Sequence, residues 1–105
     1  MTTFESVWSR IQKNLNPGTS IKNWTVLKDY LGDTMKIVGV RGGYIEVDAP
    51  NANTTQHISK EEFEKVWDIW PDYKGGKFPR YQIRDMTRFS KYIISILHWA
   101  EQGEG

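Results

Sequence analysis

Residues 34–48 read TMKIVGVRGGYIEVD, and this stretch decides the class of fold. Apolar and β-branched residues on both sides of Arg41-Gly42-Gly43 predict two strands. Glycine supplies the positive φ angles of a tight turn, so residues 41–43 are predicted to join the strands as a hairpin. Side chains alternate between the two faces of a strand, which places Ile45 and Val47 together on one face. The stretch therefore predicts an antiparallel hairpin with one apolar face.

Weaker strand patterns flank this hairpin on both sides. Residues 21–26 are predicted to form a strand before it, and residues 54–58 a strand after it. Residues 31–33 have the composition of a turn, and residues 49–53 that of a loop. The predicted sheet therefore has three to four strands.

A helical pattern precedes the strands. Apolar residues of the segment Thr3 to Asn16 recur at the spacing of an amphipathic helix: Phe4, Val7, Trp8, Ile11 and Leu15. Thr2 or Thr3 is expected to be its N-cap. Pro17 is expected to end it, because proline disfavours helical geometry in the residue before it.

Two further helices are predicted after the strands. Ser59 and Glu62 form a capping box ahead of apolar residues with helical spacing: Phe63, Val66, Trp67 and Trp70. Pro71 is expected to end this helix. The last helix is predicted from Thr87 to Glu101, and residues 80–86 fit no clear pattern. The inward-facing residues of this last helix are predicted to be Phe89, Tyr92, Ile93, Ile96, Leu97 and Ala100.

These elements predict an α+β fold. It has an N-terminal helix, a small antiparallel sheet of three to four strands, and two C-terminal helices packed on the sheet. The predicted core includes Phe63, Val66, Trp67, Ile93, Ile96 and Leu97. The 105 residues have the length of a single domain, which we place at residues 1–105.

The composition argues against several classes of protein. There is no cysteine, so we expect no disulfide framework, thiolate zinc site or cysteine nucleophile. A net charge of +1 argues against a strongly basic or acidic tail. The N-terminus lacks a signal-peptide pattern, and no stretch approaches the ~20 apolar residues of a membrane span. We therefore expect a soluble, cytoplasmic domain with no membrane partner.

Catalytic and metal-binding motifs are missing from the sequence. His57 and His98 stand outside any nucleophile or metal-ligand pattern. We therefore predict no enzyme activity, no metal and no other cofactor. The alternative is acid–base catalysis by one of these histidines with Glu46 or Asp48.

Most of the positive charge lies in one segment. Residues 72–92 hold six cations against two anions, a net charge of +4. The six are Lys74, Lys77, Arg80, Arg84, Arg88 and Lys91. If residues 80–91 formed one continuous helix, the last four would lie within about 80° of arc, since each residue turns by ~100°. Tyr73, Phe78 and Tyr81 lie among them, and cations with aromatic rings suit a phosphate backbone with stacked bases.

Other interpretations of these charges remain open. They are a solvated helix face, an acidic protein partner, or ion pairs with Glu61, Glu62 and Glu64. Two glycine segments, Arg41-Gly42-Gly43 and Lys74-Gly75-Gly76-Lys77, can also turn backbone amides toward an anion. A hairpin turn and a connector between helices explain the same two segments without a ligand.

The leading hypothesis is a non-enzymatic binding or accessory module that contacts nucleic acid through the six cations. Five tryptophans in 105 residues support an alternative. Core packing accounts for most of them, but Trp24, Trp70 or Trp99 can line a dimer surface or a pocket for a flat or cationic ligand. The alternative is therefore a homo-oligomeric or small-ligand-binding module.

Residues 55–97 resemble small bacterial and phage modules that end in an S/T-R-x-S-x-Y-I-I-S-I-L helix. The resemblance rests on Val66-Trp67-x-x-Trp70-x-x-Tyr73-x-x-Gly76-x-x-x-Arg80 and on TRFSKYIISIL at residues 87–97. Such modules accompany restriction, phage-defence or mobile-element genes, including gene cassettes. The matching positions are Arg80, Arg88, Ser90 and Tyr92, and no catalytic residue carries over. The resemblance implies an accessory role and adds to the nucleic-acid hypothesis.

Overall fold

The computed structural model describes residues 3–26, 29–48 and 54–102 and has an α+β fold. Helix α1 (Phe4–Asn14) begins at Thr3, whose hydroxyl accepts the Ser6 N–H at 3.2 Å. Its buried residues are Phe4, Val7, Trp8 and Ile11, as the apolar spacing predicts. The predicted N-terminal helix is thus confirmed, with bounds within two residues.

The sheet is an antiparallel meander in the order β1-β2-β3-β4. Its strands are β1 (Ser20–Thr25), β2 (Asp29–Val40), β3 (Tyr44–Asp48) and β4 (Gln56–Ser59). The hairpin at residues 41–43 is confirmed, and Ile45 and Val47 are buried on the inner face. The predicted loop at residues 49–53 lies outside the described residues.

The predicted turn at residues 31–33 is wrong, because these residues belong to β2. Thr25 pairs with Asp29 across the β1–β2 ladder, so pairing begins two residues before the predicted turn. Gly32 has a φ of +93° inside the strand. Glycine tolerates this backbone angle, so the residue that indicated a turn marks a local irregularity in a long strand.

Helix α2 (Lys60–Lys74) starts at the predicted cap, where the Ser59 hydroxyl accepts the Glu62 N–H at 3.4 Å. Pro71 does not end the helix, so this prediction is wrong; Pro71 lies in the last turn, and Gly75 follows the helix. Proline removes one backbone hydrogen bond there. Tyr73 is 1% exposed and stacks on Trp70, and its burial favours a helix that continues past Pro71.

The predicted last helix divides into α3 (Arg80–Met86) and α4 (Ser90–Glu101) with a connector between. Thr87 has extended backbone angles, φ −154° and ψ 137°, and its hydroxyl accepts the Phe89 N–H at 3.2 Å. Such local bonds compete with helix formation. Thr87 and Phe89 are also buried, so the break places both side chains in the core. Three helices therefore follow the sheet, where two were predicted.

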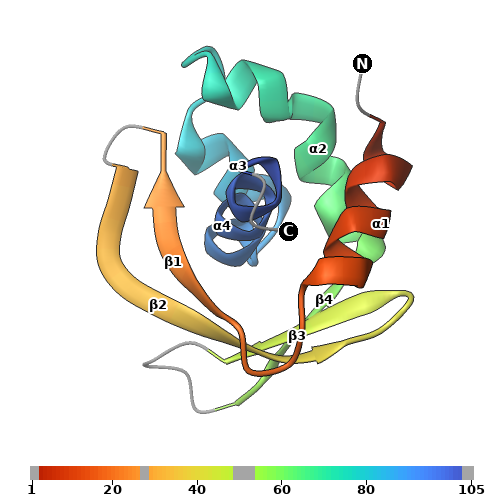
Figure 1. Cartoon of the computed structure of the whole chain (residues 1–105). Coiled ribbons are helices and arrows are strands. Elements are labelled where there is room, and N and C mark those ends of the chain that lie inside the picture. The colour runs from red at the N-terminus through yellow and green to blue at the C-terminus, as the bar shows by residue number, and fades with distance from the viewer. Residues whose placement is uncertain (1–2, 27–28, 49–53, 103–105) are drawn as a thin grey trace.

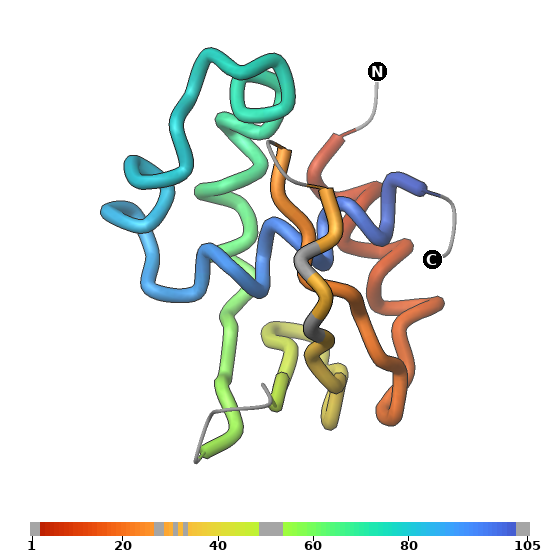
Figure 2. The backbone as a smooth tube through the Cα atoms, turned by 90° about the vertical axis from the view of Figure 1, so that its left-hand side faces the viewer, coloured from red at the N-terminus to blue at the C-terminus, as the bar shows by residue number. Residues whose placement is uncertain are grey.

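Helix α4 is the central element of the fold, and the curved sheet and the other helices surround it (Figure 1). It packs on β1 and contacts α1, α2 and α3, while α2 contacts β4. Viewed from the side, α4 passes behind β1 and β2 (Figure 2). Most residues of α4 are buried, as expected for a helix that is apolar on nearly all sides. The buried residues are Ser90, Ile93, Ile94, Ser95, Ile96, Leu97 and Ala100.

The predicted core is confirmed except at one position. Phe63, Val66, Ile93, Ile96 and Leu97 are buried, but Trp67 is only half-buried at the edge of the cluster. Trp70 and Tyr73 complete the inner face of α2. No helix within the described residues has both the length and the apolar character needed to cross a bilayer.

Candidate ligand-binding site

The cations of the basic segment do not share one helical stripe. Arg80 and Arg84 lie on α3, Arg88 lies in the connector, and Lys91 lies on α4. Because the helix is interrupted at residues 87–89, the spacing that would align the four on one face does not apply. The continuous-helix condition of the sequence prediction is therefore not met.

Several of these cations contact other parts of the protein. Lys74 forms an ion pair with Glu101, with Nζ 2.8 Å from Oε2. The Arg88 guanidinium lies over the ring of Phe89, 4.9 Å from its centroid. Arg80 and Lys91 are half-buried, whereas Lys77 and Arg84 are exposed. Among the described residues, none of the segment's arginines lies within 4.0 Å of the carboxylates of Glu61, Glu62 or Glu64, although the charge of Arg88 acts on Glu62.

Hydrogen bonds that involve the backbone hold both glycine segments in place. After α2, the N–H groups of residues 75–78 donate to backbone carbonyls of Pro71, Asp72 and Tyr73. These amides therefore cap the helix. In the hairpin turn, the carbonyls of residues 41–43 accept hydrogen bonds from Gln12, Trp8 and Lys60, respectively. These bonds hold the turn against α1 and the start of α2.

A histidine–carboxylate pair lies on the outer face of the sheet. His57 Nε2 is 3.1 Å from Glu46 Oε2, and the ring of Tyr44 stacks on the imidazole at 5.2 Å. The His57 side chain is 61% exposed. The distance suits proton transfer, but this pair stands on an open surface, whereas general acid–base chemistry needs a substrate held against the base. Asp48 instead accepts a hydrogen bond from Thr55 at 2.8 Å.

A pocket of about 210 Å³ opens between the edge strand β1 and α4. It brings together residues that are far apart in the sequence, from β1, β2 and α4. The lining residues are Ser20, Ile21, Lys22, Tyr30, Ser95, His98 and Trp99. Within the described residues, this lining combines three planar rings and two serine hydroxyls with the ammonium group of a lysine.

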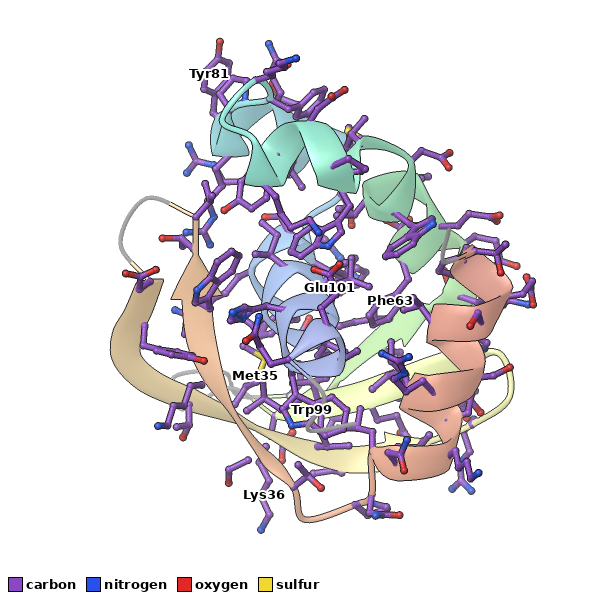
Figure 3. All side chains as sticks on the ribbon, turned by 45° about the horizontal axis from the view of Figure 1, so that its top comes forward. Met35, Lys36, Phe63, Tyr81, Trp99 and Glu101 are labelled. Carbon is purple, nitrogen blue, oxygen red and sulfur yellow. The ribbon has the colours of Figure 1, made fainter. Side chains whose placement is uncertain are left out.

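Ring contacts hold two residues of the lining, His98 and Tyr30. The His98 imidazole stacks on the indole of Trp24, with centroids 3.9 Å apart and planes 11° apart. The ring of Tyr30 meets His98 edge-on at 5.7 Å, and Lys22 Nζ lies 5.4 Å from the Tyr30 centroid. Trp99 is half-buried on α4 beside the sheet (Figure 3). The pocket therefore has preformed flat walls.

Half-buried hydrogen bonds tie β1 to α4 and hold the end of α4. The Ser95 hydroxyl accepts the backbone N–H of Trp24 at 3.0 Å, which ties β1 to α4. At the end of α4, the Trp70 indole N–H donates to Glu101 at 2.7 Å. Arg10 donates to the carbonyl of Ala100 at 3.2 Å. These bonds fix the turn of α4 that presents His98 and Trp99.

Sequence reasoning identified part of this site. Trp24, Trp99 and His98 drew attention as surplus aromatic residues or as a candidate base. Lys22 and Tyr30 were missed because their roles depend on pairing between β1 and β2. Ser95 did carry a signal, since it is a polar residue between Ile94 and Ile96 in an apolar helix.

Comparison with known proteins adds no further residue to this site. The resemblance of residues 55–97 to mobile-element modules stays a prediction. No protein-family model, no curated protein and no solved structure matches the chain.

Proposed function

We propose that this chain is a non-enzymatic binding module that holds a small molecule in the pocket between β1 and α4. The observation that carries the proposal is the convergence of Tyr30, His98 and Trp99 around an open volume of about 210 Å³. Small-molecule sites characteristically combine apolar or aromatic walls with a few polar groups that orient the ligand. Here Lys22 and Ser20 supply such groups at the β1 side.

Binding fits this lining better than catalysis does. The Ser95 hydroxyl already accepts the Trp24 amide and donates to the Lys91 carbonyl at 3.0 Å, so it is a structural group. The His98 imidazole stacks on the ring of Trp24 and meets the ring of Tyr30 edge-on. The described residues of the lining include no carboxylate.

A fragment screen by two-dimensional NMR tests this proposal. We expect chemical-shift changes from bound fragments to concentrate on the amides of the lining residues. Ser20→Phe places a ring at the pocket and should abolish these changes. The matched control is Ser9→Phe, the same substitution at an exposed serine of α1, which should leave them intact. Fragments that bind elsewhere, or that bind both variants equally, would contradict the proposal.

Nucleic-acid binding is the second candidate, and one exposed ring favours it. Tyr81 on α3 is 56% exposed and points away from the body of the protein (Figure 3). Arg84 and Lys77, also exposed, lie near it in the chain. An exposed ring can stack on a base while the cations contact phosphates. An acidic protein partner and a homodimer stay predictions without such an observation.

Gel shifts with single-stranded DNA at several salt concentrations test this second candidate. Three phosphate contacts, by Lys77, Arg84 and Arg88, predict a log–log slope of about −2. Replacing Lys77 and Arg84 with alanine should flatten the slope by more than half. A control in which Lys13 and Lys36 are replaced should not change it. A wild-type protein that retards no DNA at low salt, where screening is weakest, would remove this candidate.

A further inference from the structure

We infer that the ligand of the β1–α4 pocket is a small planar anion, an aromatic ring that carries a carboxylate or a similar acidic group. This inference rests on the proposed function and names the chemistry of its ligand. Two features of the lining carry it: the aromatic rings and the position of the Lys22 ammonium group.

The walls select a flat ligand. Tyr30, His98 and Trp99, which carry planar rings, line the pocket, and the parallel stack of His98 on Trp24 holds the imidazole in place. Rings gain from offset-stacked and edge-to-face contacts with other rings, beyond the apolar area that they bury. Because the volume is only about 210 Å³, the pocket suits one ring with a short substituent.

The charge of the lining selects an anion. Lys22 is the one lining residue with a permanently ionised side chain, and no Asp or Glu belongs to the lining within the described residues. None of the ion pairs among the described residues involves Lys22. Its ammonium group is therefore available to pair with an acidic group of a ligand.

The same lysine disfavours a cationic ligand. Aromatic cages bind cations over the faces of their rings. Here Lys22 Nζ already lies over the ring of Tyr30, 5.4 Å from its centroid. A ligand ammonium at this position would displace Lys22 and meet its charge at close range. The flat-ligand form of the aromatic-pocket hypothesis is therefore favoured over the cationic form.

Three probes of nearly equal shape and different charge test the inference. They are phenylacetate, phenylacetamide and phenethylamine, which are anionic, neutral and cationic at neutral pH. We expect phenylacetate to bind about five- to tenfold more tightly than phenylacetamide at low salt, as one charge-assisted contact predicts. Phenethylamine should bind most weakly. Affinities come from NMR titrations that follow the lining amides.

Lys22→Gln should reduce the affinity for phenylacetate about five- to tenfold, to that of the amide, and leave phenylacetamide binding unchanged. The unchanged amide serves as the control for pocket integrity. Lys13→Gln, at an exposed lysine of α1, should leave all three affinities unchanged.

Equal affinities for the three probes, or tightest binding of phenethylamine, would overturn the anion assignment and leave the pocket as a ligand site. Binding by none of the three would overturn the ligand class. The fragment screen with Ser20→Phe then decides separately whether the pocket binds small molecules at all.

Discussion

Ser95 is buried in an apolar part of α4, and its hydroxyl provides a hydrogen-bond acceptor for a backbone N–H of the edge strand β1. It accepts the N–H of Trp24, a donor that points away from β2 toward the helix. A buried backbone donor that loses its partner costs about 1–3 kcal/mol. Ser95 therefore links the stability of the domain to the geometry of the pocket.

Ser95→Ala should lower the free energy of unfolding by about 1–3 kcal/mol in denaturant titrations, because the Trp24 amide loses its acceptor. Hydrogen exchange at the Trp24 amide should accelerate in the same variant. Ser9→Ala on the exposed side of α1 is the control and should change stability by less than about 0.5 kcal/mol. Unchanged Trp24 exchange would show that this hydrogen bond is not formed in solution.

Glu62 supplies a pH-dependent contribution to stability. A hydrogen bond with the Thr87 side chain lowers the pKa of Glu62 below its ordinary value of 4.5. Lys65 and the charge of Arg88 also lower the pKa of Glu62, whereas burial of the carboxyl raises it. A carboxyl whose pKa is lower when folded stabilises the protein fully above pH 4.5. This stabilisation is lost as the pH falls through the folded-state pKa.

Glu62→Gln should therefore be less stable than the wild type at neutral pH, and the difference should shrink as the pH falls below 4.5. Thr87→Val should raise the pKa of Glu62 toward its ordinary value, since it removes the largest cause of the shift. NMR titration of the Glu62 carboxyl measures this directly. A wild-type Glu62 that titrates above 4.5 would be inconsistent with the contact to Thr87.

Local patterns predict elements well here where the local and tertiary preferences agree. The apolar spacing of α1, the Ser59 cap of α2 and the glycine hairpin at residues 41–43 each satisfy both. Pro71 and the connector at residues 87–89 show the opposite case. Whether the helix continues past Pro71 and breaks at residues 87–89 depends on the burial of Tyr73, Thr87 and Phe89 in the core. No local sequence pattern contains this information.

Tyr73→Phe tests the extension of α2 beyond Pro71. The Tyr73 hydroxyl accepts the backbone N–H of Val26 at 3.1 Å, so the end of α2 supports the end of β1. We expect a loss of about 1 kcal/mol in the free energy of unfolding. Tyr81→Phe, at an exposed tyrosine of α3, is the matched control and should be neutral. Equal effects of the two variants would argue against the extended helix.

Trp70 and Trp67 lie on the same helix and differ in burial. Trp70 is buried and donates to Glu101, whereas Trp67 is half-buried. Trp70→Ala should cost about 3–5 kcal/mol in the free energy of unfolding. Trp67→Ala should cost less than half as much, measured by the same denaturant titration. The reverse order would mean that α2 presents a different face to the core.

At the scale of the whole molecule, the fold class follows from the sequence, whereas the site follows from topology. Strands and helices with matching apolar faces predict an α+β domain from local patterns alone. The pocket joins Lys22 on β1 to His98 on α4, and these residues meet because α4 packs on the edge strand. The composition shows a surplus of aromatic residues, but it does not show that some of them line the same pocket.

Intermolecular NOEs between bound phenylacetate and the protein test the pocket most directly. We predict NOEs from the phenyl ring protons to the side chains of Tyr30 and Trp99, and from the methylene group to Lys22. Ser20→Phe should remove them, and Ser9→Phe should retain them. NOEs to Tyr81 on α3 or to Tyr44 on the outer face of the sheet, with none to Trp99, would contradict a binding site between β1 and α4.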